Sequence, residues 1–214
     1  MILQIMVDQI YQHIQYPIIM LMYGKILLNM VLQPQDYIPI PQEVIDMIAI
    51  ANYLYSIVYS DVYGKEDWRN WADQLIISHD NLDVWIYDLS MARNKEQVFE
   101  ALFEQMHYER IEIGLSYPLT EIIQGYYYYK YINKEILLYQ LLTDAGTVAD
   151  AGQDSKMSCE YFYSKLNQID IDKTIANKEN FITEITSYFL PLYREAMYQK
   201  SIIESITLED IISE

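Results

Sequence analysis

The sequence predicts an all-α fold of about nine to eleven helices. Apolar residues recur mainly at the helical spacing i, i+3, i+4 and i+7, and polar capping residues divide these stretches into segments of ordinary helix length. Strand-like alternation is scarce, and only six Gly and six Pro occur in 214 residues. We expect one all-α domain over residues 1–214, either compact or an irregular stack of helix pairs. A subdivision into N-terminal helices over 1–91 and a helix-pair region over 92–214 is the alternative.

The first helices are predicted from apolar periodicity and proline positions. Two helices, over 2–15 and 17–31, are separated by a proline. The three prolines of residues 33–41 predict an extended connection, because each disfavours helix in the residue before it. Pro41 then suits the first position of a helix that ends near Tyr59.

Two helices are predicted next. The first, over 65–77, has a single buried stripe formed by Trp68, Trp71, Ala72 and Leu75. The second is short, over 81–91, and Asn81 is its candidate N-cap.

The tripeptide Asn-Lys-Glu recurs at residues 94, 133 and 177, and it predicts a helix start at each position. Asn is a favoured N-cap, and an early Glu suits the positive end of the helix dipole. Further helices, over 118–131 and 155–168, lie between these starts. A helix pair every 39 to 44 residues fits a stacked helical repeat. A common cap without any repeat explains the same pattern, and both interpretations stay open.

The C-terminal part is predicted to contain three helices, over 178–190, 191–203 and 208–213. A proline separates the first two of these segments. Residues 145–154 hold two of the six Gly and are the best candidate for a bend or a functional loop.

The sequence carries a large excess of acidic residues. Thirty-one Asp and Glu against 14 Lys and Arg give a formal charge of −17 and a pI near 4.4. This charge disfavours direct binding to nucleic acid or to an anionic membrane, because both need a basic surface. It favours a basic protein, since long-range attraction speeds the encounter. We expect a basic protein partner, no nucleic acid and no membrane, and we leave a homo-oligomer open.

Residues 1–32 are largely apolar but predict neither a membrane span nor a secretion signal. No basic residue precedes the apolar run, Asp8 interrupts it, and Lys25 with Asn29 shortens it below the roughly 20 residues that a span needs. The single cysteine, Cys159, cannot form an internal disulfide, which fits a reducing compartment. A cytoplasmic location is therefore expected.

His79 and Asp80 form a His-Asp pair of the kind with which helical metal-dependent phosphohydrolases hold a metal. Such a site needs further ligands, and His13 or Asp150 could supply them only through the packing of the fold. The pair also fits a plain turn before the next helix. The sequence therefore assigns no metal site, and His79 with Asp80 supports only an alternative interpretation as a metallohydrolase.

Other chemical motifs are weak or missing from the sequence. Glu104 and His107 form half of a carboxylate-bridged di-iron motif, but no second Glu-x-x-His pair occurs. Cys159 lacks the surroundings of a nucleophile and is expected to be a buried, inert thiol inside a helix. The sequence has no P-loop, dinucleotide-binding or Gly-x-Ser-x-Gly motif. It therefore predicts no catalytic residue and no cofactor, and it favours a protein that is not an enzyme.

Acidic residues are clustered in two neighbouring segments. Between Arg69 and Arg93 there is no Lys or Arg, but there are four aspartates, Asp73, Asp80, Asp83 and Asp88. On the next helix a glutamate recurs every four residues, opposite apolar positions 98, 102 and 106, as Glu96, Glu100 and Glu104. This ridge fits either a solvated helix face or an anionic surface for Lys and Arg of a partner.

Tyrosine is unusually abundant, with 22 residues, and five of them lie within residues 126–131. Successive helix positions turn by about 100°, so these rings cannot all face one core. Exposed Tyr suits a protein interface, whereas Tyr at the edge of a core can simply replace Phe. We take Tyr126, Tyr127 and Tyr129 as candidate binding residues and leave the core alternative open.

These features together predict an acidic, tyrosine-rich, cytoplasmic protein-binding module. Its most concrete form is an inhibitor or immunity-type protein that covers the cationic cleft of a nuclease-like toxin, because carboxylates can occupy a cleft built for phosphates. The predicted binding residues are the four aspartates, three glutamates and three tyrosines named above. The alternatives are a helical metallohydrolase and a structural helical-repeat scaffold whose charge serves only solubility.

Overall fold

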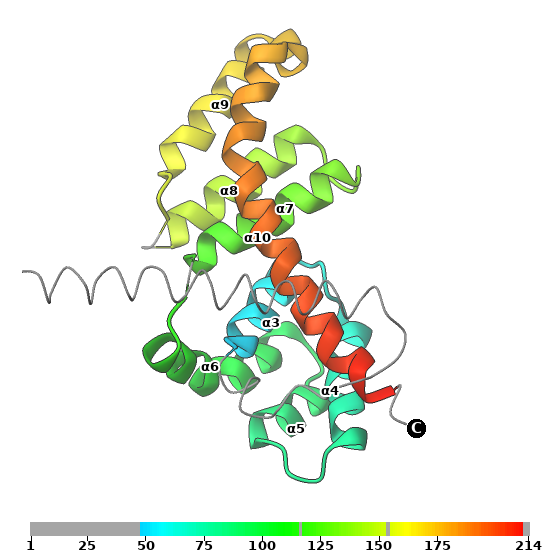
Figure 1. The fold of residues 1–214 in the computed structure, drawn as a ribbon. Coiled ribbons are helices and arrows are strands. Elements are labelled where there is room, and N and C mark those ends of the chain that lie inside the picture. Colours follow the sequence, from blue (N-terminus) through cyan, green and yellow to red (C-terminus); the bar gives the residue numbers. More distant parts are fainter. Residues whose placement is uncertain (1–47, 116, 153–154, 212–214) are drawn as a thin grey trace, which may run out of the picture. The chain divides into compact units, whose positions relative to one another are not determined.

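A computed structural model describes residues 48–115, 117–152 and 155–211, with side chains as far as residue 206 (Figure 1). All regular elements of these residues are helices, which confirms the all-α class. They are α3 (Ile50–Tyr59), α4 (Lys65–Ser78), α5 (Val84–Met91), α6 (Lys95–Glu112), α7 (Leu119–Ile132), α8 (Leu138–Ala151), α9 (Cys159–Ile171), the 3₁₀ helix η1 (Lys173–Asn177) and α10 (Glu179–Ile211).

The described residues belong to one compact unit, Gln42–Glu214. Their eight α-helices are fewer than the nine to eleven expected of the whole chain. The helices predicted over 2–15 and 17–31, and the connection over 33–41, lie outside the described residues. The predicted division between residues 91 and 92 stays a prediction.

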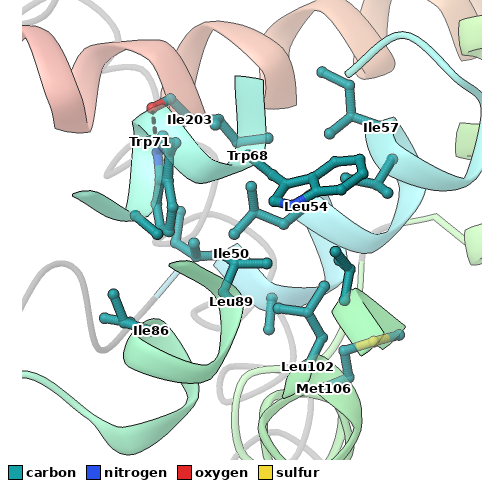
Figure 2. Packing of buried hydrophobic residues seen from close by; sticks show 14 of the residues in the cluster. Ile50, Leu54, Ile57, Trp68, Trp71, Ile86, Leu89, Leu102, Met106 and Ile203 are labelled. Carbon is teal, nitrogen blue, oxygen red and sulfur yellow. Dashed lines mark hydrogen bonds between the residues drawn. The ribbon is translucent and has the colours of Figure 1, made fainter. Parts of the chain in front are cut away.

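A first hydrophobic core joins α3, α4, α5 and α6 to the C-terminal half of α10 (Figure 2). The predicted stripe on α4 is buried in it, as expected, through Trp68, Trp71, Ala72 and Leu75. The indole nitrogen of Trp71 donates a hydrogen bond to the carbonyl oxygen of Ile203 at 3.0 Å (Figure 2). This bond satisfies a buried polar group and holds α10 on α4.

A second hydrophobic core is formed by α8, α9, the N-terminal half of α10 and tyrosines of α7, of which Tyr128 is buried. Several aromatic rings pack together in it. Tyr128 stacks on Phe189 with centroids 5.4 Å apart, and Phe162 lies against the Phe189 ring at 6.1 Å. The buried ammonium of Lys165 pairs with the Glu184 carboxylate at 2.6 Å. Among the described residues, four of the eleven buried hydrophobic residues of this core are aromatic, against three of twenty in the first core.

Helices α7 and α10 contribute to both cores. In Figure 1, α10 passes α7 and reaches α4, and its 33 residues correspond to about 50 Å of helix. The two helices cross at Gly125, where an added Cβ would lie 2.3 Å from the carbonyl oxygen of Leu192. Only glycine allows this close approach of two backbones.

The predicted helix break at Pro191 is wrong, because α10 continues through it. The proline removes one backbone hydrogen bond, but its ring is exposed, and Phe189 and Leu192 on either side of it are buried. Packing of these side chains outweighs the local preference. One helix therefore replaces the three predicted over 178–190, 191–203 and 208–213.

Helix α3 begins at Ile50, and residues 48 and 49 are not helical, so the predicted continuous helix from Pro41 is wrong at this point. The reason lies on α6. The Glu109 side chain, only 1% exposed, accepts hydrogen bonds from the backbone N–H groups of Ala51 at 2.9 Å and Asn52 at 3.0 Å. It thus caps α3 in place of a local N-cap side chain. Burial raises the pKa of Glu109, and hydrogen bonds from Ala51, Asn52 and Gln105 oppose the rise.

Of the three helices that follow α3, two agree with prediction and the third differs at its start. Helix α4 lies within one residue of the predicted range, and α6 begins after Asn94, whose side chain accepts a hydrogen bond from the N–H of Gln97 at 3.0 Å. Helix α5 begins after Asp83, so the predicted cap at Asn81 is wrong. The segment from 79 to 83 is irregular, with a bend at residues 80 and 81, and it leads into α5.

The Asn-Lys-Glu start signal is correct at residue 94 and close at 177, but wrong at 133. Asn133 ends α7, Lys134 has a left-handed φ of 64°, and α8 begins only at Leu138. In stacked repeats each unit contacts only its neighbours. Here α10 contacts α3, α4 and α7, so the arrangement differs from a stack of helix pairs.

The predicted bend or loop over 145–154 is wrong for residues 145–151, since α8 continues to Ala151, and residues 153 and 154 lie outside the described residues. Gly146 serves close packing there, because an added Cβ would lie 2.9 Å from the ring of Tyr163 on α9. Helix α9 begins at Cys159 instead of near residue 155. The Cys159 thiol is half-buried at this helix start and lies 3.4 Å from a carboxylate oxygen of Asp150, so the expected burial inside a helix is wrong.

Candidate protein-binding site

A surface groove of about 1000 Å³ lies between α5 and α6. We call it the α5–α6 groove. Its lining consists of Asp83, Val84, Trp85 and Asp88 from α5 and its cap, and Glu96, Phe99, Glu100, Ala101, Phe103, Glu104, Gln105 and Tyr108 from α6. Five of these twelve residues are carboxylates, and none is Lys, Arg or His. The groove is therefore both anionic and apolar.

One face of α6 forms most of the groove. Val98, Leu102 and Met106 are buried in the first core, so the helical period turns positions 96, 100 and 104 outward, and these three glutamates are exposed. A second row, Phe99 and Phe103, runs beside them at the same four-residue spacing.

Helix α5 completes the groove because its opposite side is anchored in the first core. Ile86 and Leu89 are buried there, whereas Asp83 and Asp88 are exposed beside α6. Trp85 is half-buried, and its ring lies 6.2 Å from that of a core tryptophan, Trp71. Its indole N–H is buried and has no hydrogen-bond partner among the described residues.

Three apolar side chains of the groove are largely exposed: Val84 at 73%, Phe103 at 71% and Tyr108 at 56%. Exposed apolar side chains gathered in one place mark an interaction surface more often than scattered ones do. Their carboxylate neighbours resemble the polar rim that surrounds the apolar centre of a protein interface. The groove can thus attract cationic groups and bury apolar ones.

The fold brings five of the ten predicted binding residues together. These are Asp83, Asp88, Glu96, Glu100 and Glu104, which come from two different acidic segments of the sequence. Asp80 is exposed but does not line the groove. Asp73 is half-buried and accepts a hydrogen bond from Ser90, so this carboxylate ties α4 to α5 instead of lining a binding surface.

The three predicted tyrosines do not belong to the groove. Tyr126 is 0% exposed, so its assignment to a surface is wrong, and the ring forms part of the first core. Tyr127 and Tyr129 are half-buried on α7. Burial raises the pKa of both Tyr126 and Tyr127, which fits rings that replace Phe within a packed helix.

The alternative metal pair lies at the end of α4. His79 is half-buried, with Nδ1 3.0 Å from the Ser78 hydroxyl, and Asp80 is exposed. His13 lies outside the described residues, and the carboxylate of Asp150 contacts the single thiol. In the described ranges no group of three or more His, Cys, Asp or Glu side chains is placed to hold a metal ion.

The sequence predicted the carboxylates of the groove but not its apolar residues. The prediction rested on charge, which does not indicate Val84, Trp85, Phe103 or Tyr108. One sequence pattern does indicate two of the apolar residues. Phe99 lies three residues after Glu96, and Phe103 lies three residues after Glu100, so an aromatic row runs beside the acidic row on the helix.

None of the described helices has the length and apolar content needed to cross a membrane. No known protein family, curated protein or solved structure matches the chain. A functional proposal therefore rests on the chemistry of the groove itself.

Proposed function

We propose that this protein is an acidic protein-binding module that captures a basic protein in the α5–α6 groove. One observation carries the proposal: five carboxylates and three exposed apolar side chains line the same groove, without any basic residue. Carboxylates attract and orient a cationic partner. Apolar side chains provide the contacts that become favourable once water is excluded.

The two kinds of side chain contribute differently. Full burial of one exposed Phe or Val side chain contributes about 1.5 to 3 kcal/mol. An exposed carboxylate–ammonium pair contributes about 0.2 to 1 kcal/mol and is screened by salt. Burial of Phe103 and its apolar neighbours therefore provides most of the binding free energy. The carboxylates instead increase the association rate and favour a basic partner.

The most specific form of the proposal is an inhibitor or immunity-type protein for a nuclease-like toxin. Glu96, Glu100 and Glu104 repeat at about 6 Å along α6, and this linear array of negative charge resembles the phosphates of a nucleic-acid strand. A cationic nuclease cleft would attract the array electrostatically. In this form the protein blocks the cleft and catalyses nothing.

Affinity capture with a matched pair of variants tests the proposal. Proteins that bind this chain are captured from the cells that make it and are identified. Each is then purified, and its affinity is measured for three proteins: the wild type, Glu100→Lys/Glu104→Lys and Glu66→Lys/Glu135→Lys. The second variant changes two exposed carboxylates outside the groove and alters the net charge equally.

Support would be a basic partner whose affinity falls at least about tenfold between about 50 and 300 mM salt. The affinity should also fall in the groove variant and persist in the control. For the inhibitor form, the partner should have nuclease activity that the wild type and the control suppress. A partner that is not basic, binding that ignores salt, or equal loss in both variants would refute the proposal.

A further inference from the structure

One face of α6 carries two parallel rows of different chemistry. One row is formed by three exposed glutamates, Glu96, Glu100 and Glu104. The other row is formed by Phe99, which is half-buried with its ring 4.8 Å from that of Tyr55 on α3, and Phe103, which is exposed. Members of each row are four residues apart, which corresponds to about 6 Å along the helix axis. The rows lie side by side because positions three and four apart share one face of a helix. Such a face selects the shape of what binds it as well as its charge.

We propose that the α5–α6 groove, in the protein-binding role proposed above, receives an amphipathic helix that carries Lys or Arg at every fourth position beside a row of apolar residues. On such a helix the cationic row also repeats at about 6 Å and matches the glutamate row. Its apolar row lies against Phe103 and the apolar residues of α5. This is packing of ridges into grooves, with a helix laid along a hydrophobic groove.

An extended segment fits the same face less well. Its side chains alternate between opposite sides, so it can turn only one row toward α6. Its backbone N–H and C=O groups would meet apolar side chains and lose their hydrogen bonds with water. Pairing with a strand cannot satisfy them, because the described residues contain no strand. A helix satisfies its own backbone and presents two adjacent rows at once.

The length of the groove sets the length of the bound helix. From Glu96 to Tyr108 the α6 axis extends about 18 Å, which is slightly more than three helical turns. A partner segment of about 12 residues therefore spans the groove, with cationic residues at three successive turns. The side chains of Lys and Arg suit this arrangement, because their stems cover apolar surface while their charged ends reach the carboxylates.

The inference is tested by measuring how three synthetic peptides of similar composition bind to the full-length protein. The first, of about 16 residues, places Lys at every fourth position beside a Leu row. The second has the same composition in scrambled order. The third is the first with two central residues replaced by Pro, which prevents the helix and keeps the charge. Fluorescence anisotropy of the labelled peptides measures the three dissociation constants.

The first peptide should bind at least about tenfold more tightly than the other two. Phe103→Ala should weaken its binding by about tenfold, because it removes the most exposed ring of the groove. The control Glu66→Lys/Glu135→Lys should leave the affinity within about twofold. Circular dichroism of Phe103→Ala, whose side chain makes little contact with the core, checks that the fold is retained.

The outcomes that overturn the inference are distinct from those that overturn the proposed function. Equal binding of all three peptides, lost in Glu100→Lys/Glu104→Lys, would mean that the groove takes basic chains without regard to helical order. The proposed capture of a basic protein would then stand and the inference would fail. Equal binding that survives the groove variant would overturn both. A dimer that dissociates on Phe103→Ala would show that a second copy fills the groove, and the inference would fail.

Discussion

Replacing Glu109 by Ala should be the most informative single perturbation of the fold. This carboxylate is buried between α6 and the start of α3, and it accepts four hydrogen bonds. Two come from the backbone N–H groups of Ala51 and Asn52, one from the Asn52 amide at 2.7 Å and one from Gln105 at 3.3 Å. The substitution removes both acceptor oxygens and leaves a space where the buried side chain was.

The expected loss of stability is roughly 3 to 5 kcal/mol. Three of the donors, on Ala51 and Asn52, are buried, and each costs about 1 to 3 kcal/mol when left without a partner. The amide of Gln105 is half-buried and can turn to water instead. The total stays below the plain sum, because water can enter the vacated space and because removal of a buried charge relieves the cost of burying it.

Urea unfolding followed by circular dichroism measures the effect. With a slope of about 2 kcal/mol per M, the midpoint should fall by about 2 M. Glu112→Ala, at an exposed position of the last turn of α6, should change the free energy of unfolding by less than about 0.5 kcal/mol. A Glu109→Ala midpoint within about 0.5 M of the wild type would refute the capping role.

Two further predictions concern single residues outside the groove. Gly125→Ala should lower the free energy of unfolding by about 3 kcal/mol or more, because its Cβ would lie 2.3 Å from the carbonyl oxygen of Leu192. Gly64→Ala, with 3.6 Å to the nearest atom, should cost less than about 1 kcal/mol, and equal urea midpoints for the two variants would contradict the close-approach explanation. A side-chain hydrogen bond from Thr174 is the main cause that lowers the pKa of Asp172 from 3.8 to about 2. Its stabilising contribution should be present above pH 3.8 and be lost as the pH falls through about 2, and an NMR titration of the carboxyl with a midpoint at its ordinary value would disprove this.

Local sequence rules predicted the elements whose causes are local. The periodic stripe around Trp68 and Trp71 and the Asn94 cap gave α4 and α6 correctly, because both signals act within one helix. The local rules failed where a residue that is distant in the sequence determines the start of a helix or the role of a glycine. The start of α3 depends on Glu109, which is more than 50 residues away and looks like any polar position of α6. Gly146 suggested a bend, but it provides contact with another helix.

The candidate site shows the same division. The spacing of Glu96, Glu100 and Glu104 predicted an outward ridge, because a helical period alone turns them away from buried neighbours. The sequence could not predict that Asp83 and Asp88 lie beside these glutamates, since their position depends on how α5 packs against α6. Likewise, a run of adjacent tyrosines cannot be sorted into core and surface until the partners of α7 are known.

Because α7 and α10 are shared between the two cores, each core of the described unit depends on helices of the other. A fragment that kept the groove but stopped before α7 would lose Tyr126 from its core and the carbonyl acceptor of the Trp71 indole. A fragment that began at α7 would expose the α10 residues that now cover α4, among them Ile203. Neither half can be cut out without exposing part of its core. The core beneath the groove is thus covered by a helix whose other end is buried in the second core.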